Sequence, residues 1–395
     1  MLSMIGFLLR GMVVLALLLS CTRVGQAQNP VPAPHEVWQL LLGGNPYWHI
    51  SETMIGPAEK AGDLRIMGTT APPRGESGAA KKLWLWRVSS TGEKLREAEL
   101  QGFPEDQVIS ASYVKILSIL DNGDLLLVTE CAPDVPLLVR IDQTSKVVWT
   151  KKLEHLRRLV VFKVVPTIDR KFLLLGQRSS KAFIAKIDGA GEILWDKTFD
   201  PTQKWEWFLD GTPTEDGGAV VVGNTNFADR VYMEIDATTV WIVKLDREGN
   251  IQAEQNFPGR HGSIARSQSG NYGLVYDQGK THDQDIWLQA VDRDLKLLWR
   301  TPMFAINFGL SGPKIAASPD GGFVVAASRQ HRLWLSQVDQ DGKKLWEFEE
   351  KGKAGKPVIS ELNFTPEALF ILVSATSQDA AKTGILKFVM PEQPK

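Results

Sequence analysis

The sequence predicts an all-β protein, a seven-bladed β-propeller built from four-stranded antiparallel blades. First, a hairpin pattern typified by Ala182–Trp195 (AFIAKIDGAGEILW) recurs, and successive copies lie 53, 46, 58, 46, 47 and 50 residues apart. Second, another hairpin pattern precedes each copy, so that a repeat supplies four strands. Third, the last repeat ends one strand short, and an orphan strand stands near the N-terminus. A period of about 50 residues with strand-like contents is typical of propeller blades and not of helical solenoids.

The recurring hairpin has recognisable turn chemistry. An Asp at the start of the turn can accept backbone N–H bonds, and a Gly two or three residues later tolerates positive φ. The flanking runs are rich in Val, Ile, Leu and Trp, as expected for buried or half-buried strands. The turn starts are Ser89, Asp142, Asp188, Asp246, Asp292, Asp339 and Val389. Seven residues later stand Arg96, Trp149, Trp195, Ala253, Trp299 and Trp346, and we expect these Trp residues to be structural.

The two chain ends are predicted to close the ring. The segment Glu36–Leu41 reads as a strand, and its Trp38 resembles the Trp of the other fourth strands. The last repeat ends after a third strand. We therefore expect the N-terminal strand to complete the last blade, which would remove the exposed sheet edges that invite aggregation.

The chain divides into three parts in order. Residues 1–27 read as a signal peptide, residues 28–35 as a Pro-rich linker, and residues 36–395 as a single propeller domain. The longest interval between turn starts, 58 residues from Asp188 to Asp246, falls in the fourth repeat, because that repeat carries an insert at Asn224–Thr239 between its second and third strands. Loops of this length are commonly functional. The seven repeats cover residues 46–100, 108–153, 158–199, 205–257, 260–301, 307–349 and 357–390.

The N-terminus indicates export from a bacterial cell. Arg10 precedes the apolar run Met12–Leu19, which is too short to span a membrane, and nothing later approaches a span. Cleavage after Ala27 would release a soluble periplasmic or secreted protein. Cleavage before Cys21, where LLSC resembles a bacterial lipobox, would leave an outer-membrane lipoprotein with Cys21 lipidated. Both alternatives remain open on the sequence.

Charge and cysteine content narrow the set of partners. The chain has 45 Lys and Arg against 46 Asp and Glu without a basic block, so we expect neither nucleic acid nor an anionic membrane surface as a partner. With Cys21 removed or lipidated, Cys131 has no intramolecular partner, and we expect a structural thiol in a monomer.

Binding residues are expected on one face of the ring. In four-stranded blades, the loops after the second and fourth strands emerge on the same side, which we call the loop face, and rigid scaffolds often bind through such loops. Its predicted loops include Asp200–Trp205, Asn224–Thr239, Asp277–Asp285 and Ser328–Arg332. The candidate binding residues are Trp205, Trp207, Arg230, Tyr232, Glu234, Asp236, His261, His282, Asp283 and His331.

Each candidate also has a plainer interpretation. The aromatic residues at the start of the fourth repeat can form a stacking platform for a sugar or a quinoid ring, or they can pack between blades. The His and Asp residues have the chemistry to hold a divalent cation, or they are ordinary polar loop residues. Their spacing matches no compact metal motif, and no catalytic or nucleotide-binding motif occurs. We predict no metal, no cofactor and no catalytic residue.

The units KIDGAGEILW and QVDQDGKKLW resemble the blades of bacterial exported quinoprotein-like propellers with PQQ-type repeats, which often end in an Asp…Gly-Lys/Glu-x-x-Trp docking element. The resemblance covers nearly all of residues 36–390. The Asp-to-Trp interval is one residue shorter here, and the quinone-dependent alcohol dehydrogenases have eight blades and longer chains. We therefore carry over no quinone- or calcium-binding residue.

Two functions from different classes follow as expectations. The first is an exported, non-catalytic scaffold that binds a protein or glycan partner through the loop face, because a well-marked fold lacks a catalytic set. The alternative is a subunit of a periplasmic quinone-type amine dehydrogenase, or another propeller enzyme, since such dehydrogenases resemble this chain in having a seven-bladed subunit. Whether the chain takes part in catalysis stays open.

Overall fold

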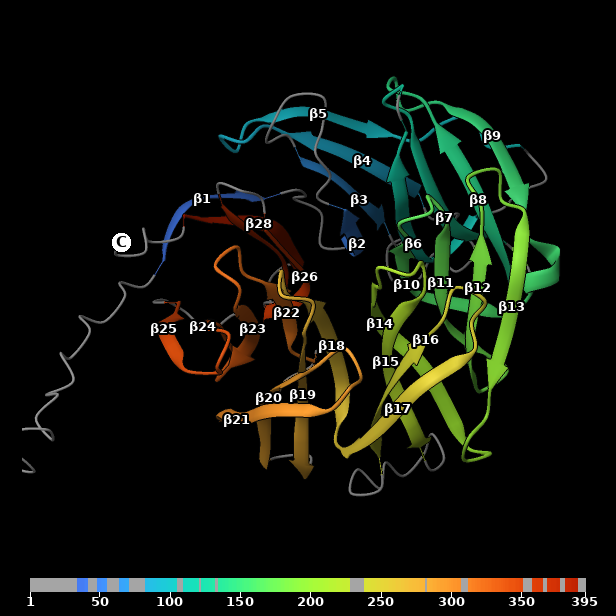
Figure 1. Cartoon of the computed structure of the whole chain (residues 1–395). Coiled ribbons are helices and arrows are strands. Elements are labelled where there is room, and N and C mark those ends of the chain that lie inside the picture. Colours follow the sequence, from blue (N-terminus) through green and yellow to red (C-terminus); the bar gives the residue numbers. More distant parts are fainter. Residues whose placement is uncertain are drawn as a thin grey trace, which may run out of the picture.

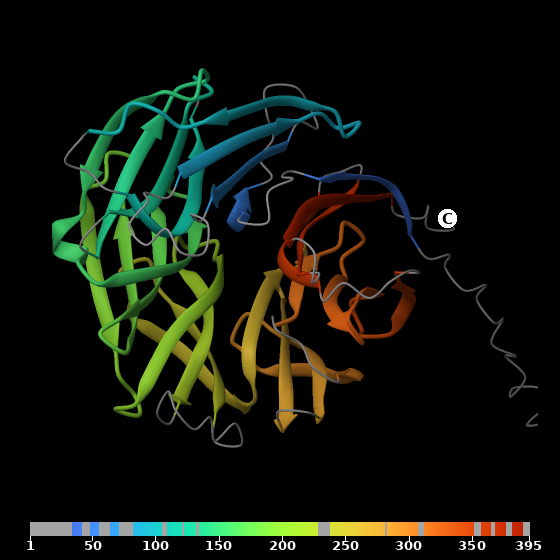
Figure 2. The same ribbon diagram turned by 180° about the vertical axis from the view of Figure 1, so that it is seen from behind.

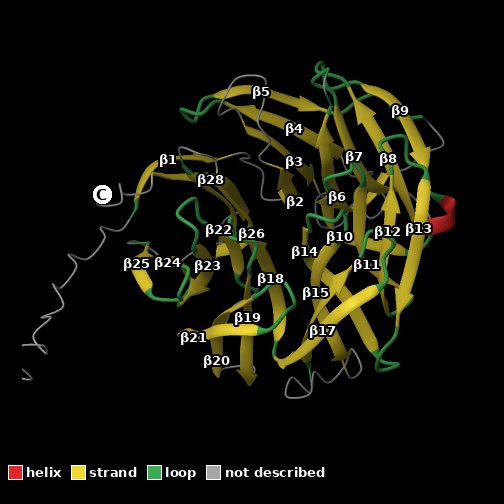
Figure 3. Cartoon of the chain, in the orientation of Figure 1, coloured by secondary structure: helices red, strands yellow, loops and turns green. Residues whose placement is uncertain are grey.

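Seven antiparallel sheets of four strands follow one another around a ring (Figures 1 and 2). The computed structural model describes residues 34–41, 48–54, 64–70, 82–104, 109–120, 122–131, 134–227, 238–280, 283–306, 312–350, 357–364, 368–376 and 381–389. Within these ranges the one helix is the short 3-10 turn Glu154–Leu156 (Figure 3). The predicted seven-bladed propeller is confirmed.

In blades 1 to 6 the strands run from the channel outward in chain order, whereas in blade 7 the order is β26, β27, β28 and then β1. Blades 1 to 3 contain β2 (Trp48–Met54), β3 (Leu64–Thr70), β4 (Lys82–Val88) and β5 (Lys94–Glu99); β6 (Ile109–Ile119), β7 (Leu125–Cys131), β8 (Val135–Ile141) and β9 (Val147–Lys152); and β10 (Leu159–Pro166), β11 (Phe172–Arg178), β12 (Lys181–Ile187) and β13 (Ile193–Phe199). Blades 4 and 5 contain β14 (Trp205–Pro213), β15 (Ala219–Phe227), β16 (Thr239–Leu245) and β17 (Ile251–Pro258); and β18 (Arg260–Arg266), β19 (Tyr272–Lys280), β20 (Asp283–Val291) and β21 (Leu297–Ile306). Blades 6 and 7 contain β22 (Lys314–Ala317), β23 (Phe323–Arg329), β24 (Arg332–Val338) and β25 (Lys344–Glu349); and β26 (Pro357–Phe364), β27 (Leu369–Thr376), β28 (Ala381–Val389) and β1 (His35–Leu41).

The ring closes as predicted, through the two ends of the chain. Strand β1 pairs antiparallel with β28, with Glu36 opposite Phe388 and Gln39 opposite Leu386. Figure 1 shows the N-terminal strand in blue beside the C-terminal strand in dark red. Blade 7 is therefore assembled from both ends and has no hairpin turn between its third and fourth strands.

The turn aspartates work as the sequence predicts. The Asp188 Oδ1 atom accepts the backbone N–H groups of Ala190 and Glu192, both at 2.9 Å. Gly191 follows with φ 75°, a conformation that favours glycine. The same pair of hydrogen bonds, from the backbone N–H groups two and four residues further along the chain, is accepted by Asp142, Asp246, Asp292 and Asp339.

The recurrent Trp residues fasten one blade to the turn of the next. Trp195 donates its indole N–H to the Arg247 carbonyl at 3.0 Å, and Trp299 donates to the Gln340 carbonyl at 2.7 Å. Arg96 makes the equivalent contact from blade 1, since its guanidinium donates hydrogen bonds to two carbonyls in the turn of blade 2. Trp346 faces blade 7, which lacks such a turn, and it donates instead to Gln337 in its own blade at 2.6 Å.

The core lies between neighbouring blades. The cluster between blades 3 and 4 joins apolar residues of β11 and β12 to Phe208 and Trp241, whose rings stack with centroids 5.2 Å apart. Between blades 1 and 2, Cys131 is a fully buried free thiol, and burial raises its pKa. An unreactive, structural thiol is expected to have this environment.

The predicted signal peptide, with Cys21 and Ala27, lies outside the described residues. In the part of the chain that the structure covers, no helix is long and apolar enough to cross a bilayer.

Candidate functional site

The antiparallel order of every blade places the connections after second and fourth strands on one side, so the loop face exists as predicted. Two of its loops differ from expectation. The prediction that Asp277–Asp285 is a loop is wrong, because β19 and β20 pair through it, with Asp277 opposite Ile286 and Lys280 opposite Asp283. The insert of blade 4 is also shorter than Asn224–Thr239, because β15 continues to Phe227.

A polar cluster of blade 5 stands at the start of the inner strand β18. His261 is exposed (44% of its side chain), and its Nδ1 lies 2.9 Å from Oδ1 of Asp277. Asp277 is buried, and its Oδ2 accepts a hydrogen bond from Arg260 Nε at 2.8 Å. One carboxylate therefore orients both a buried guanidinium and an exposed imidazole.

The backbone around His261 is constrained by its neighbours. His261 has φ 52°, the left-handed region that non-glycine residues rarely adopt. Its N–H donates to Asn224 Oδ1 at 3.3 Å, and Asn224 is fully buried in β15 near the root of the insert. Gly312 of blade 6 lies against the other side, since a Cβ there would stand 2.3 Å from the Cβ of His261. The cluster thus joins blades 4, 5 and 6.

The loop before blade 4 is held by two carboxylates, those of the buried Glu206 and the partly exposed Asp200. Glu206 is fully buried, and its Oε1 accepts bonds from both the backbone N–H and the hydroxyl of Thr202. Asp200 pairs with Lys181 of the neighbouring hairpin, and this pairing lowers the pKa of the Asp200 carboxyl. These bonds fix the path into β14, where Trp205 and Trp207 are half-buried, so that part of each ring packs and part remains accessible.

The other predicted residues divide into two groups. His331 lies on the loop face of blade 6, in the two-residue turn between β23 and β24, with φ 63°. Only the backbone of Asp283 is described, at the start of β20. Among described residues no three His, Cys, Asp or Glu side chains gather as metal ligands would. Outside the described residues lie Arg230, Tyr232, Glu234, Asp236 and His282.

A second site, which we did not predict, lines the central channel. Each inner strand places one residue opposite the fourth residue of the second strand in its blade. That residue is polar in all seven blades: Glu52, Lys115, Lys163, Asp210, Ser263, Lys314 and Glu361. We call these seven positions the channel ring. Glu52 belongs to it by register alone, because its side chain is not described.

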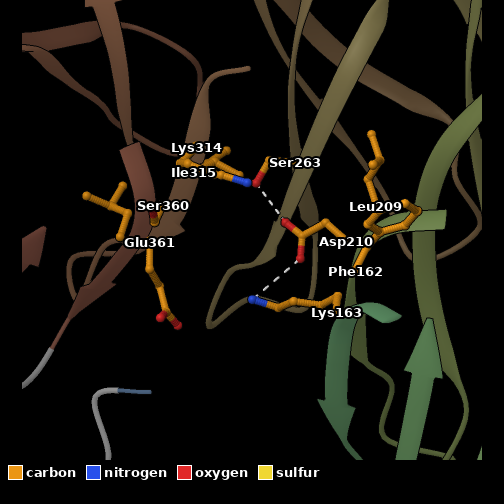
Figure 4. Close-up of a pocket in the computed structure, with 10 residues that line it drawn as sticks. Phe162, Lys163, Leu209, Asp210, Ser263, Lys314, Ile315, Ser360 and Glu361 are labelled. Atoms are coloured by element: carbon orange, nitrogen blue, oxygen red, sulfur yellow. Dashed lines mark hydrogen bonds and ion pairs between the residues drawn. The ribbon is translucent and has the colours of Figure 1, made fainter. Parts of the chain in front are cut away.

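Asp210 is the best-connected member of the channel ring. Its Oδ2 accepts bonds from the Ser263 hydroxyl at 2.7 Å and the Ile264 N–H at 3.2 Å, and its Oδ1 accepts the Gly211 N–H at 2.9 Å. Lys163 Nζ lies 3.7 Å from the same carboxylate. Figure 4 shows Asp210 between Lys163 and Ser263, with Lys314 and Glu361 on the opposite wall.

The three lysines differ in electrostatic environment. Burial lowers the pKa of Lys115 well below its ordinary value, and the charges of Lys163 and Lys314 lower it further. Burial also lowers the pKa of Lys314, with Lys163 adding to that effect. Burial opposes the charge of Lys163 as well, yet Asp210 and Glu361 outweigh it and raise its pKa. Lys163 is deep in the protein although 36% of its side chain is exposed, because it lines the channel cavity.

The channel cavity has a volume of about 50 Å³. Pockets for drug-sized ligands or cofactors measure roughly 300–1,000 Å³. A sugar or a quinoid ring is therefore too large for this cavity, whereas roughly three to five water molecules fit.

A sequence signal for the channel ring did exist. In blades 3 to 6 its residue stands nine positions before the first residue of the second strand: Lys163 before Phe172, Asp210 before Ala219, Ser263 before Tyr272, and Lys314 before Phe323. Aligning the blades on their second strands would have brought these four polar residues into one column.

Comparisons with known proteins support the fold. No protein-family model matches the chain, and no curated protein matches it. Among solved structures, the polysaccharide lyase Uly1 is similar over 92% of this chain and 100% of its own, with a TM-score of 0.57 and 8% identity. BBS1N, solved in complex with ARL6DN, is similar over 92% and 99%, with a TM-score of 0.54 and 11% identity. Drosophila Plexin A, in complex with Semaphorin 1b, is similar over 91% and 88%, with a TM-score of 0.52 and 8% identity. At these identities the likeness concerns the fold alone.

Proposed function

We propose that this protein is a non-catalytic propeller, exported from a bacterial cell, that binds a protein partner through its loop face. The observation that carries the proposal is His261. A non-glycine residue in the left-handed region costs free energy, and such strain tends to persist where function requires it. Here the strained residue is exposed, oriented by a buried carboxylate, and placed beside the root of the blade 4 insert.

The surroundings of His261 fit a protein surface better than a small ligand. The half-exposed Trp205 and Trp207 lie on the neighbouring blade, and exposed cations such as Lys204 and Arg332 stand on the same face. Interfaces between proteins commonly combine aromatic anchors with a polar rim. Two similar propellers, BBS1N and Plexin A, were solved with protein partners, and this supports the proposal by analogy.

The test compares the two faces of the ring. The full chain, with its own leader and a C-terminal tag, is crosslinked in a bacterial host and purified from the periplasm and the medium. The loop-face variant carries Lys204→Glu and Arg332→Glu. The matched control carries Arg247→Glu and Lys296→Glu, which are exposed on the third-to-fourth-strand turns of the opposite face.

We expect the loop-face variant to recover at least tenfold less of a reproducible partner protein, while the control recovers as much as the wild type. The same proteins are applied to a glycan array. Equal recovery by both variants, the absence of a reproducible partner, or binding to a glycan in place of a protein would each overturn the proposal.

One observation favours the alternative function. The chain has seven blades, the number expected for the propeller subunit of quinone-type amine dehydrogenases and not for the eight-bladed alcohol dehydrogenases. This alternative predicts that the protein purifies with a smaller catalytic chain and that the complex reduces a dye in the presence of an amine. Purification without such a chain, and without dye reduction, would remove it.

A further inference from the structure

We propose that the central channel binds one small inorganic oxoanion, such as sulfate or phosphate, between Lys163 and Lys314. This site lies at the level of the channel ring, within the 50 Å³ cavity, and is independent of the partner proposed for the loop face.

Lys163 and Lys314 reach the cavity from opposite sides. Lys163 comes from β10 on the wall formed by blades 3 and 4, and Lys314 comes from β22 on the wall formed by blades 6 and 7 (Figure 4). Ser360 and Ser263 line the same space, but the single O–H of Ser263 is already donated to Asp210, so Ser360 is the hydroxyl donor that remains. Ammonium groups and hydroxyls are suitable donors for the several oxygens of an oxoanion, and ammonium donors give the stronger, charge-assisted bonds.

The nearest carboxylate cannot satisfy both lysines. Asp210 already accepts three hydrogen bonds, from Ser263, Ile264 and Gly211, and it also pairs with Lys163. Lys314 lines the cavity, and among the residues drawn in Figure 4 none is joined to its amine by a hydrogen bond or an ion pair. A buried or half-buried ammonium without an acceptor is costly, and a bound anion would provide one.

The charged side chains that line the cavity are two lysines, Lys163 and Lys314, and two carboxylates, Asp210 and Glu361. Burial is the main cause that lowers the pKa of Lys314; Lys163 adds to this effect, while Asp210 and Glu361 oppose it. The register adds Glu52 to the same ring. A metal cation would meet both lysines of the lining, and Asp210, one of its two carboxylates, is already saturated by donors. An anion would relieve the repulsion between the lysines.

The cavity also sets the size of the ligand. Its volume corresponds to roughly three to five water molecules. A tetrahedral or planar oxoanion occupies comparable space, and a phosphate ester with a sugar or a lipid does not fit. Filling the cavity with water alone is the competing explanation.

Isothermal titration with sodium sulfate, at constant ionic strength set with sodium chloride, tests the site in the full chain. We expect saturable binding to one site, at least tenfold weaker in Lys314→Met and restored by Lys314→Arg. The control Lys204→Met, an exposed lysine of the loop face, should bind as the wild type does. Absence of saturable binding, or an adventitious ion that is bound equally by Lys314→Met, would overturn the proposal.

A second measurement needs no variant. Amine-reactive footprinting of the wild type, read by mass spectrometry, should show that sulfate protects Lys163 and Lys314 while Lys204 reacts at an unchanged rate. Sulfate affinity should also fall as the pH rises toward the ordinary lysine value of 10.5, because burial lowers the pKa of Lys314 below that value, while sulfate keeps its charge. The charged groups that line the cavity together with Lys314 are Lys163, Asp210 and Glu361. Equal reactivity with and without sulfate would contradict the site whatever the partner experiment shows.

Discussion

At the residue scale, Asp277 shows how a buried charge can organise a surface. It is almost completely buried and accepts a bond from Arg260, itself nearly buried, while it also orients the exposed His261. Taking two charges out of water is costly, and the pair is tolerated because each satisfies the other. The imidazole therefore faces solvent in a fixed orientation.

Replacing Asp277 with Ala should lower the free energy of unfolding by about 3–5 kcal/mol, because Arg260 would be left buried without its counter-charge. Urea unfolding measures the change. Asp294→Ala is the control, since this exposed acid lies 3.9 Å from Lys244 and should cost no more than about 0.5 kcal/mol. Equal losses in the two variants would contradict the structural role given to Asp277.

The turn aspartates make the stability of the ring depend on acid pH. Hydrogen bonds from Lys146 and Thr144 hold the pKa of Asp142 below its ordinary value of 3.8. Burial acts to raise the pKa of Asp246, but the bonds from Asn250 and Glu248 outweigh it, so that this pKa is also lowered. These carboxylates therefore stabilise the fold above their ordinary pKa, and the contribution is lost as the pH falls through the lower folded values.

The double variant Asp142→Asn, Asp246→Asn should lose less stability than the wild type when the pH falls from about 5 to about 2. An amide oxygen can still accept the turn bonds, but it no longer titrates in this window. Urea unfolding at several pH values gives the two slopes, with Asp294→Asn as the control that should keep the wild-type slope. Parallel slopes for the double variant and the wild type would rule out this account.

At the element scale, the turn between the third and fourth strands of one blade contacts a fourth-strand Trp side chain of the blade before it. Trp299 donates to Gln340, and the turn glycine Gly342 lies directly under the indole ring. Gly342 thus serves two purposes, since its φ of 80° favours glycine and its missing Cβ leaves room for Trp299. The short Asp-to-Trp hairpin seen in the sequence therefore forms the contact between neighbouring blades.

Gly342→Ala should destabilise the protein more than Gly321→Ala. Both residues have positive φ, which costs roughly 1–2 kcal/mol for a residue with a Cβ. At Gly342 the new Cβ would also stand 2.6 Å from Cε3 of Trp299, whereas at Gly321 it would meet nothing within 4 Å. Thermal unfolding of both variants measures the difference. A loss of thermal stability for Gly342→Ala no larger than that for Gly321→Ala would show that the close contact with the indole ring does not affect stability.

Most elements could be predicted because each blade repeats the same local chemistry. The turn Asp and Gly, the apolar third strand and the following Trp recur at fixed offsets. Because the last repeat lacks a fourth strand, the orphan strand at Glu36–Leu41 is then predicted to complete the last blade. The loop at Asp277–Asp285 was predicted wrongly because its polar residues hid a pair of extended strands. The channel ring was missed because each blade supplies a single polar residue in an inner strand, and its meaning appears only when all seven meet at one level.

At the scale of the whole molecule, one strand pair holds the ring shut. Residues of β1 pair with β28 from His35 opposite Val389 to Leu41 opposite Gly384. Without β1, the core residues Leu386 and Phe388 would lie in an unprotected edge strand, and such edges pair readily with other chains.

A chain lacking residues 1–41 should therefore elute as oligomers or aggregates in size-exclusion chromatography and unfold at a lower temperature. The matched control lacks residues 1–33 and keeps all of β1, so it should elute as the intact ring does. The two truncations differ by only eight residues, so composition alone would not separate them. A monomeric, equally stable protein from the shorter chain would mean that the closure contributes little.

The paired ends also define how the molecule would respond to mechanical load. His35 starts β1 and Val389 ends β28, and the two lie opposite each other. A force that pulls the ends apart would load their hydrogen bonds one after another, as in a zipper, and no bond would share the load with its neighbours. We infer that tension applied through the ends would open the circle at this seam while every other blade was still intact, which makes the seam the weakest point under load.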